Sequence, residues 1–215
     1  MNIDAMRDYF NRRERSVQGA VGEWAILLPL VEHQGKLCLL YETRAETLIG
    51  HQPGEVCFPG GRREKGETPA QTACRETFEE LGIPRSEIEV LAPLDVIQDI
   101  SDRVIYPFLG RVTPQGLAAM NPSDAEVKNV FFVPLEHLRH YPEEVYRYRI
   151  TPQVDDSFPY ERIGFPKDYP WRRGWMEVPI YEYEGHHIWG MTARTTRWLL
   201  RELDKLEEEN AGGTD

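Results

Sequence analysis

The sequence contains little cysteine. Its three cysteines, Cys38, Cys57 and Cys74, are scattered among 215 residues and lack the paired spacing of a zinc site. They lie in apolar or helical surroundings, where a cysteine usually acts as a small core residue and seldom as a nucleophile. We therefore predict neither a zinc-stabilised domain nor cysteine-based catalysis.

Positive charge is also scarce. The chain has 25 Lys and Arg residues against 36 Asp and Glu residues, which gives a formal net charge of −11 at pH 7. Proteins that bind nucleic acid through a general electrostatic surface need an excess of basic side chains to neutralise phosphates. We expect no nucleic-acid partner, and any phosphate handled by this chain requires a local positive charge or a metal ion.

Long apolar runs are missing. A typical apolar run, residues 24–31, is WAILLPLV, whereas a helix needs about 20 apolar residues to cross a bilayer. The chain begins with MNIDAMRDYFNRRERS, which has no apolar signal core. We expect a cytoplasmic protein without membrane association.

The rest of the composition is typical of a globular protein, with 40% hydrophobic and 28% charged residues. The length is sufficient for one domain with a sizeable core. We predict an amphipathic helical segment over 1–22, a main domain over 23–209 and a flexible tail over 210–215. The aromatic stretch 144–184 predicts two strands and a long ordered loop, which would wall a substrate pocket or form the contact of a homodimer.

Apolar and alternating segments predict a central sheet in the main domain. Turn signals such as HQG separate the first two of these segments, which favours a hairpin. The predicted strands cover residues 23–31, 36–42, 56–58, 87–97 and 104–112, and a C-terminal helix is predicted over 191–210.

The most informative stretch is residues 60–83, GGRREKGETPAQTACRETFEELGI. Either Thr68 or Glu67 can cap a helix, Pro69 suits its first turn and Gly82 suits its end. The spacing predicts a helix from Thr68 to about Leu81, with one apolar stripe facing the core.

Three glutamates, Glu76, Glu79 and Glu80, share a second stripe of this helix. Carboxylates so close together repel one another unless a cation lies among them, and hard divalent ions bind such oxygens. Arg75 lies four residues before Glu79 and can pair with it. A solvated acidic helix face explains the same spacing, so spacing alone leaves both interpretations open.

The charged positions resemble the motif of the Nudix hydrolases, G-x5-E-x7-R-E-U-x-E-E-x-G-U, where U is a bulky aliphatic residue. One position departs from it, because Thr77 occupies the first U. The matching residues are Gly61, Glu67, Arg75, Glu76, Glu79, Glu80, Gly82 and Ile83.

This resemblance implies an α/β fold, the Nudix-type α/β/α sandwich with a mixed sheet, with the motif helix on one face and the C-terminal helix on the other. It also implies an enzyme that binds Mg²⁺ or Mn²⁺ and hydrolyses a nucleoside diphosphate linked to another group. Arg75 would orient a glutamate and Glu67 would be mainly structural. The implied metal ligands are the Gly60 carbonyl, Glu76, Glu79 and Glu80, and the implied catalytic residues are Glu79 and Arg75.

The segment before the motif is similar to the coenzyme A pyrophosphatase branch of the family, as is the later stretch IWGMTAR. The arginine usual in that branch is replaced here by Ile49 and Gly50. The resemblance implies hydrolysis of coenzyme A or its acyl derivatives to 3′,5′-ADP and (acyl-)4′-phosphopantetheine. The residues that carry it are Arg44, Ala45, Leu48, His51, Gly54, Val56 and Phe58 to Gly61, of which Arg44, His51 and Phe58 are the implied substrate contacts.

Other interpretations stay open at this point. The substrate could be ADP-ribose, NADH or another nucleoside diphosphate derivative, and a Nudix-fold module could bind a nucleotide as a sensor without hydrolysing it. A loop acid after the motif often serves as a base in this family, and Glu126 is the first candidate here, with Asp124 second. A solvated loop acid explains either residue equally well, and a structural or solvated histidine explains His51 equally well.

Overall fold

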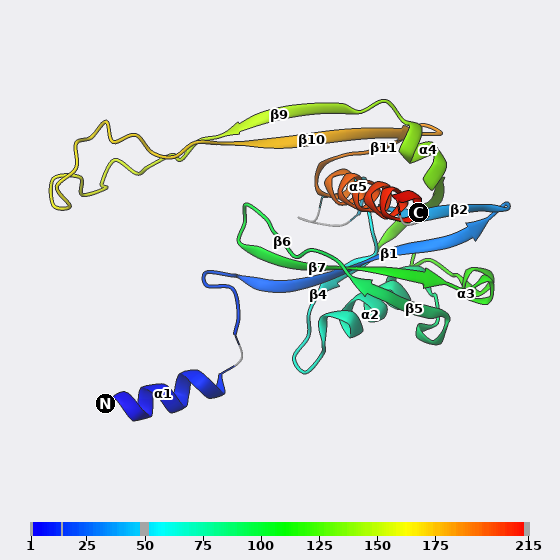
Figure 1. The fold of residues 1–215 in the computed structure, drawn as a ribbon, viewed down its shortest axis with the longest axis horizontal. Helices are drawn as coiled ribbons and strands as arrows, with labels where there is room; N and C mark the ends of the chain where they lie inside the picture. Colours follow the sequence, from blue (N-terminus) through cyan, green and yellow to red (C-terminus); the bar gives the residue numbers. More distant parts are fainter. Residues whose placement is uncertain (1, 14, 48–51, 213–215) are drawn as a thin grey trace. The chain divides into compact units, whose positions relative to one another are not determined.

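The computed structural model describes residues 2–13, 15–47 and 52–212 (Figure 1). The chain divides into two compact units, Met1–Phe132 and Val133–Asp215, and each is described by itself. The predicted domain boundaries at 22/23 and 209/210 stay predictions. In the part of the chain that the structure describes, no helix combines the length and apolarity needed to span a bilayer.

The first unit is built on a mixed sheet (Figure 1). The order of its main strands is β3-β2-β1-β7-β5, while β4 pairs with β1, β6 with β7 and β8 with β2. β1 and β7 run parallel, and β1 is antiparallel to β2 and β4. The strands are β1 (Gly22–His33), β2 (Lys36–Arg44), β3 (Val56–Cys57), β4 (Gly60–Arg62), β5 (Ile88–Pro93), β6 (Ile97–Gln98), β7 (Arg103–Val112) and β8 (Val127–Pro134).

The helices of the first unit are α1 (Ile3–Arg12), α2 (Pro69–Leu81), the 3-10 helix η1 (Arg85–Glu87) and α3 (Pro114–Ala119). α1 has no buried residue, although its sequence is amphipathic as predicted. The short α3 was not predicted, because only its cap, Thr113 followed by Pro114, marks six residues as a helix.

α2 confirms the predicted motif helix. Thr68 and Gln71 form a capping box at its start, and Gly82 ends it in a left-handed conformation with φ 69°. Its inner face joins the core of the sheet through Ala73 and Leu81. Thr77, which stands where the motif has an aliphatic residue, is fully buried, and its hydroxyl donates to the Ala73 carbonyl at 2.7 Å. The departure from the motif is therefore accommodated without an unpaired polar group.

The predicted strand over 87–97 is interrupted. Its first residue, Glu87, belongs to η1, and the chain then forms β5 and the short β6 on either side of a break. The Leu94 N–H donates to the Pro107 carbonyl at 2.9 Å within that break. Proline and a register shift in β5 explain why a continuous apolar segment does not form one strand.

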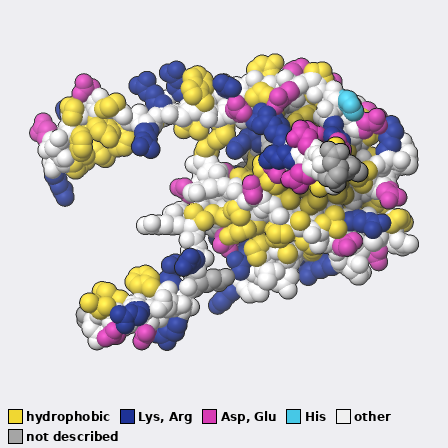
Figure 2. Space-filling view, in the orientation of Figure 1, with side chains coloured by type: hydrophobic (Ala, Val, Ile, Leu, Met, Phe, Trp, Pro, Cys, Tyr) yellow, Lys and Arg dark blue, Asp and Glu magenta, His cyan; other side chains and the backbone are white. Residues whose placement is uncertain are grey.

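The second unit contains α4 (Leu135–His140), β9 (Glu144–Ile150), β10 (Gly174–Tyr183), β11 (His186–Ile188) and α5 (Gly190–Gly212). β10 pairs antiparallel with both β9 and β11, and the predicted arrangement of two strands joined by a long loop is confirmed. Apolar side chains gather on the loop between β9 and β10 (Figure 2). There the rings of Phe158, Tyr160 and Trp171 contact one another.

Candidate active site

A glycine strand runs beside the motif helix. β4 pairs with β1 so that Gly60 lies opposite Ile26, and a Cβ atom on Gly60 would lie 2.7 Å from the Ile26 Cα. A Cβ atom on Gly61 would lie 2.5 Å from both carboxylate oxygens of Glu76. A side chain is excluded at the two positions for different reasons. At Gly60 it would collide with the backbone of β1, and at Gly61 it would collide with the carboxylate of Glu76.

Glu80 connects the helix to this strand. It is 4% exposed, and its Oε2 accepts a hydrogen bond from the Gly60 N–H at 2.8 Å. Burial raises the pKa of Glu80 well above its ordinary value, the charge of Glu42 raises it further, and the bond from Gly60 opposes the shift. A buried acid of this kind is stabilised in its charged form when a cation binds beside it.

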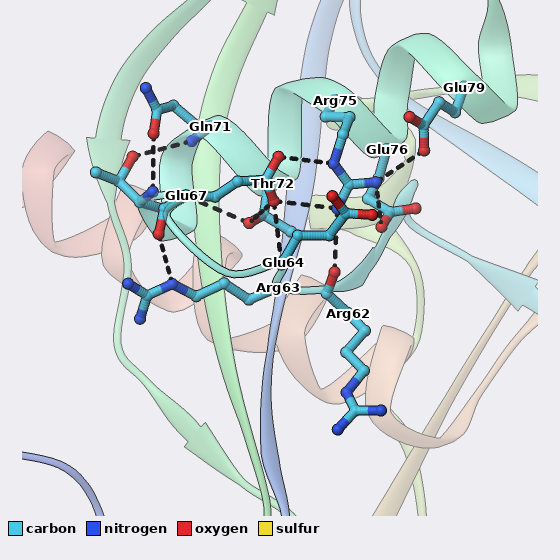
Figure 3. Close-up of polar contacts among 10 residues, drawn as sticks. Arg62, Arg63, Glu64, Glu67, Gln71, Thr72, Arg75, Glu76 and Glu79 are labelled. Atoms are coloured by element: carbon cyan, nitrogen blue, oxygen red, sulfur yellow. Dashed lines mark hydrogen bonds and ion pairs between the residues drawn. The ribbon is translucent and has the colours of Figure 1, made fainter.

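Arg75 organises the other acids of the motif (Figure 3). Its Nε donates to Glu67 at 2.8 Å, and its NH1 contacts Glu76 at 2.9 Å and Glu79 at 2.8 Å. Its NH2 also donates to the Arg62 carbonyl at 3.0 Å, and the side chain is only 10% exposed. One guanidinium thus fixes three carboxylates and the backbone of β4.

Glu67 accepts hydrogen bonds from two further groups besides Arg75. Thr72 donates to its Oε2 at 2.9 Å, and the Glu64 N–H donates to the same oxygen at 3.2 Å. The hydrogen bond from Arg75 is the largest cause that lowers the pKa of Glu67 to about 2. Glu67 is therefore ionised near neutral pH and holds Arg75 in place.

Glu76 and Glu79 differ in exposure. Burial raises the pKa of Glu76, while the neighbouring Arg75 lowers it. The Glu79 side chain is 48% exposed and is anchored by its ion pair with Arg75. The helix thus presents one half-buried and one open carboxylate beside the buried Glu80.

Glu42 of β2 is a further buried acid, which the sequence did not single out. It is 1% exposed, and the Cys57 thiol contacts its Oε1 at 3.4 Å. Its Oε2 is buried without a hydrogen-bond partner among the described residues, as is the Nε of Arg44. Burial raises the pKa of Glu42 to about 7, against the Cys57 contact and the charge of Arg44. A glutamate within a buried strand is the signal that could have identified it, because unpaired acids are rarely buried.

The residues around Glu80 suit a hard divalent cation. Within the described ranges, no group of three or more His, Cys, Asp or Glu side chains is already arranged to hold a metal ion. The ion pairs of Arg75 account for part of this, since they occupy Glu76 and Glu79. Carboxylate oxygens of the type that Mg²⁺ and Mn²⁺ prefer are nevertheless present. One is the unpaired oxygen of Glu42, and others belong to Glu76, whose carboxylate fits beside Gly61 because glycine has no side chain.

The remaining predicted site residues differ in burial. Phe58 is 4% exposed and stacks on Tyr41 with ring centroids 4.7 Å apart, which is a core position. Glu126 is exposed, and its charge influences the pKa values of both Glu42 and Glu76. Asp124 is exposed as well, whereas His51 lies outside the described residues. The roles of these residues stay predictions.

The mixed sheet and the helix with its glutamates beside a glycine strand define the class as an α/β protein with an acidic site. Residues 23–154 match the family described as NUDIX domain, and the chain belongs to the Nudix hydrolase family. The predicted fold class is thereby confirmed. Nudix hydrolases generally use divalent metal ions.

Curated relatives resemble the chain over much of its length. It is 38% identical over 130 residues to the peroxisomal coenzyme A diphosphatase NUDT7 of Mus musculus, which covers 60% of this chain and 53% of the relative. It is 31% identical over 180 residues to the mitochondrial coenzyme A diphosphatase NUDT8 of Homo sapiens, which covers 83% of this chain and 68% of the relative. The chain thus spans about half the length of the first relative and two thirds of the second.

Among solved structures, a MutT/nudix family protein from Enterococcus faecalis aligns with 97% of this chain and 70% of its own. The sequence identity is 15% and the TM-score is 0.47.

Proposed function

We propose that the protein hydrolyses the diphosphate bond of coenzyme A or its acyl derivatives, giving 3′,5′-ADP and (acyl-)4′-phosphopantetheine, with Mg²⁺ or Mn²⁺ as cofactor. The similarity to two proteins named coenzyme A diphosphatases carries this substrate assignment. The reaction type is supported by the arrangement of Glu76 and Glu80 beside the glycine strand.

The proposed roles of the acidic residues come from the family motif, and their positions support them. Glu76, Glu80 and the Gly60 carbonyl would hold the cation, and Glu79 would complete its ligands. When bound, the cation would neutralise the diphosphate charge and lower the pKa of a coordinated water. Arg75 acts as a positioning residue, because each carboxylate that it contacts is fixed in its rotamer.

The proton and the substrate need further groups. A water molecule attacks one phosphorus atom, the anhydride P–O bond breaks, and Glu126 accepts the proton of the water as general base. An exposed loop acid can do so when it reaches the water only with substrate bound. Arg44 would contact the diphosphate, and its buried, unpaired Nε is consistent with an anionic partner. We also propose contacts from His51 and from the segment around Phe58.

The setting of the enzyme is part of the same proposal. We infer a cytoplasmic protein with a small-molecule nucleotide substrate. We also infer that it has no nucleic-acid partner, because its net charge is −11. We also propose a homodimer, because exposed apolar side chains remain on α1, among them Ile3, Tyr9 and Phe10.

A substrate panel tests the function. Coenzyme A, acetyl-coenzyme A, ADP-ribose and NADH are compared at equal concentration with Mg²⁺ and with Mn²⁺, and products are separated by chromatography. We expect the highest kcat/KM for coenzyme A or its acetyl ester. A clear preference for ADP-ribose or NADH would contradict the substrate assignment while leaving the reaction type intact, and the replacement of the usual arginine by Ile49 and Gly50 makes this the main alternative.

The variant E80Q tests the reaction type. It removes the charge of the buried acid but keeps its shape, so we expect a folded protein without turnover on any substrate. Full activity of E80Q would exclude the proposed role of the motif helix. A nucleotide-binding module without hydrolysis predicts instead that the wild-type protein releases no product even when enzyme is in excess over substrate.

A further inference from the structure

Glu42 is an acid that the proposed chemistry leaves without a role. It lies in β2, where residues Cys38 to Glu42 are all buried, and it is 1% exposed. Its Oε1 accepts from a thiol, which is a weak hydrogen-bond donor. Its second oxygen has no partner in the described part of the chain. An ionised carboxylate in such a place is costly unless a positive charge compensates it.

The backbone places Glu42 close to the motif helix. The pairing of β2 with β3 sets Glu42 opposite Cys57, and the chain then continues through Pro59 to Gly60, whose N–H donates to Glu80. Glu42 is also the charged group with the largest effect on Glu80. Two buried acids from different elements thus lie near enough for the charge of one to act on the other.

The basic side chains of this region compensate the two buried acids only in part. Neither Glu42 nor Glu80 forms an ion pair with any described Lys, Arg or His, whereas Arg75 is fully engaged by other carboxylates. Arg44 is the basic side chain that influences both acids, yet its Nε is itself buried without a partner. The space between these groups is therefore deficient in positive charge.

We infer that Glu42 supplies a carboxylate oxygen to the divalent cation that Glu80 binds, so that the ligands come from the sheet as well as from the motif helix. The inference rests on one part of the proposed function, namely that a divalent cation binds beside Glu80. An added charged oxygen ligand raises the affinity of a hard cation, since ligand charge is one of the main determinants of that affinity. The affinity for the free cation should therefore depend on Glu42.

Titration of the full chain with Mn²⁺ in the absence of substrate tests this. The free Mn²⁺ is measured from its electron paramagnetic resonance signal for the wild type, E42Q, E80Q and E46Q. Glu46 is the matched control, because it is exposed and pairs with Lys128, so E46Q changes the net charge equally. We expect E42Q to bind about tenfold or more weakly, as for other groups that support a metal site, and E46Q to bind like the wild type.

Thermal unfolding with and without Mn²⁺ gives a second measurement. Without the ion, E42Q should melt no lower than the wild type, because it removes an uncompensated buried acid. With the ion, its rise in melting temperature should be smaller than that of the wild type. If E42Q does not fold, Glu42→Met serves instead, since it keeps the length of the side chain without a polar group to satisfy.

The outcomes separate this inference from the proposed function. If E42Q binds Mn²⁺ as tightly as the wild type while E80Q does not, the role of Glu42 is refuted and the metal site stands. If the wild type itself binds no Mn²⁺ and no substrate is turned over with any divalent ion, the proposed function fails and this inference with it.

Discussion

Gly61 gives the sharpest test of how the site is built. In G61A the new methyl carbon would lie 2.5 Å from each carboxylate oxygen of Glu76, whereas ordinary contacts begin near 3.4 Å. The carboxylate must therefore move by about 1 Å, and a displacement of that size at a reacting centre costs about 10²-fold in rate. We expect kcat/KM to fall by about this factor, with weaker Mn²⁺ binding.

Stability should change much less than activity in G61A. The atoms in the way belong to the far end of a side chain, which can rotate, and the pairing of β4 with β1 does not need a glycine at this position. We expect a loss of less than about 1 kcal/mol in free energy of unfolding, in the usual range for a substitution without a buried cavity or charge. G60A is the contrasting variant, because the atoms it meets are the backbone of β1, which cannot move aside, so it should fail to fold.

The assay compares G61A with G174A. Gly174 starts β10, and a Cβ atom there would lie 3.8 Å from Ile150, so G174A should resemble the wild type. Turnover and Mn²⁺ affinity are measured for each variant, with urea unfolding as the stability measurement. If G61A retains the kcat/KM and the Mn²⁺ affinity of the wild type, the position of the Glu76 carboxylate beside Gly61 is not important for activity.

Three further results are expected. Arg75→Ala removes the buried guanidinium that binds Glu67, Glu76 and Glu79 and should lower the free energy of unfolding by about 3 kcal/mol in urea, so a change under 1 kcal/mol would contradict its central role. Because the folded-state pKa of Glu67 is depressed to about 2 from 4.5, its stabilising effect is present above pH 4.5 and is lost as the pH falls toward 2. E67Q should therefore flatten the stability profile between pH 4.5 and 2, and an unchanged slope would argue against the Arg75 interaction. Trp171→Ala removes part of the aromatic packing that orders residues 151–173, so limited proteolysis should cut this loop faster, whereas an unchanged cleavage rate would show that the order has another cause.

Much of the first unit could be predicted because its signals are local. The motif helix has a cap, a proline in its first turn and a glycine at its end, and each determines one boundary without reference to the rest of the chain. The hairpin of β1 and β2 likewise follows from two apolar runs around a turn. The family motif added the identity of the acids, but it could not show that Arg75 binds three of them at once.

The roles of buried residues were harder to predict, because they depend on contacts between distant segments. Glu42 closes an apolar run and looks like the polar end of a strand, yet its pairing with Cys57 places it inside. Phe58 follows a loop signature that suggests substrate contact, and it stacks on Tyr41 in the core. The burial of Glu42 and of Phe58 depends on how the sheet packs, and no local sequence pattern determines this packing.

The ion pairs of Arg75 have a consequence for how the site is filled. If Glu76 and Glu79 hold the cation as we propose, the oxygens that pair with Arg75 cannot fully serve a metal ion at the same time, so Arg75 would compete with the cation for them. Competition of this kind weakens loading in the resting protein and makes it depend on the phosphate oxygens that a substrate brings. The site should therefore release its metal readily when the products leave, and turnover should respond to the concentration of free cation around the protein.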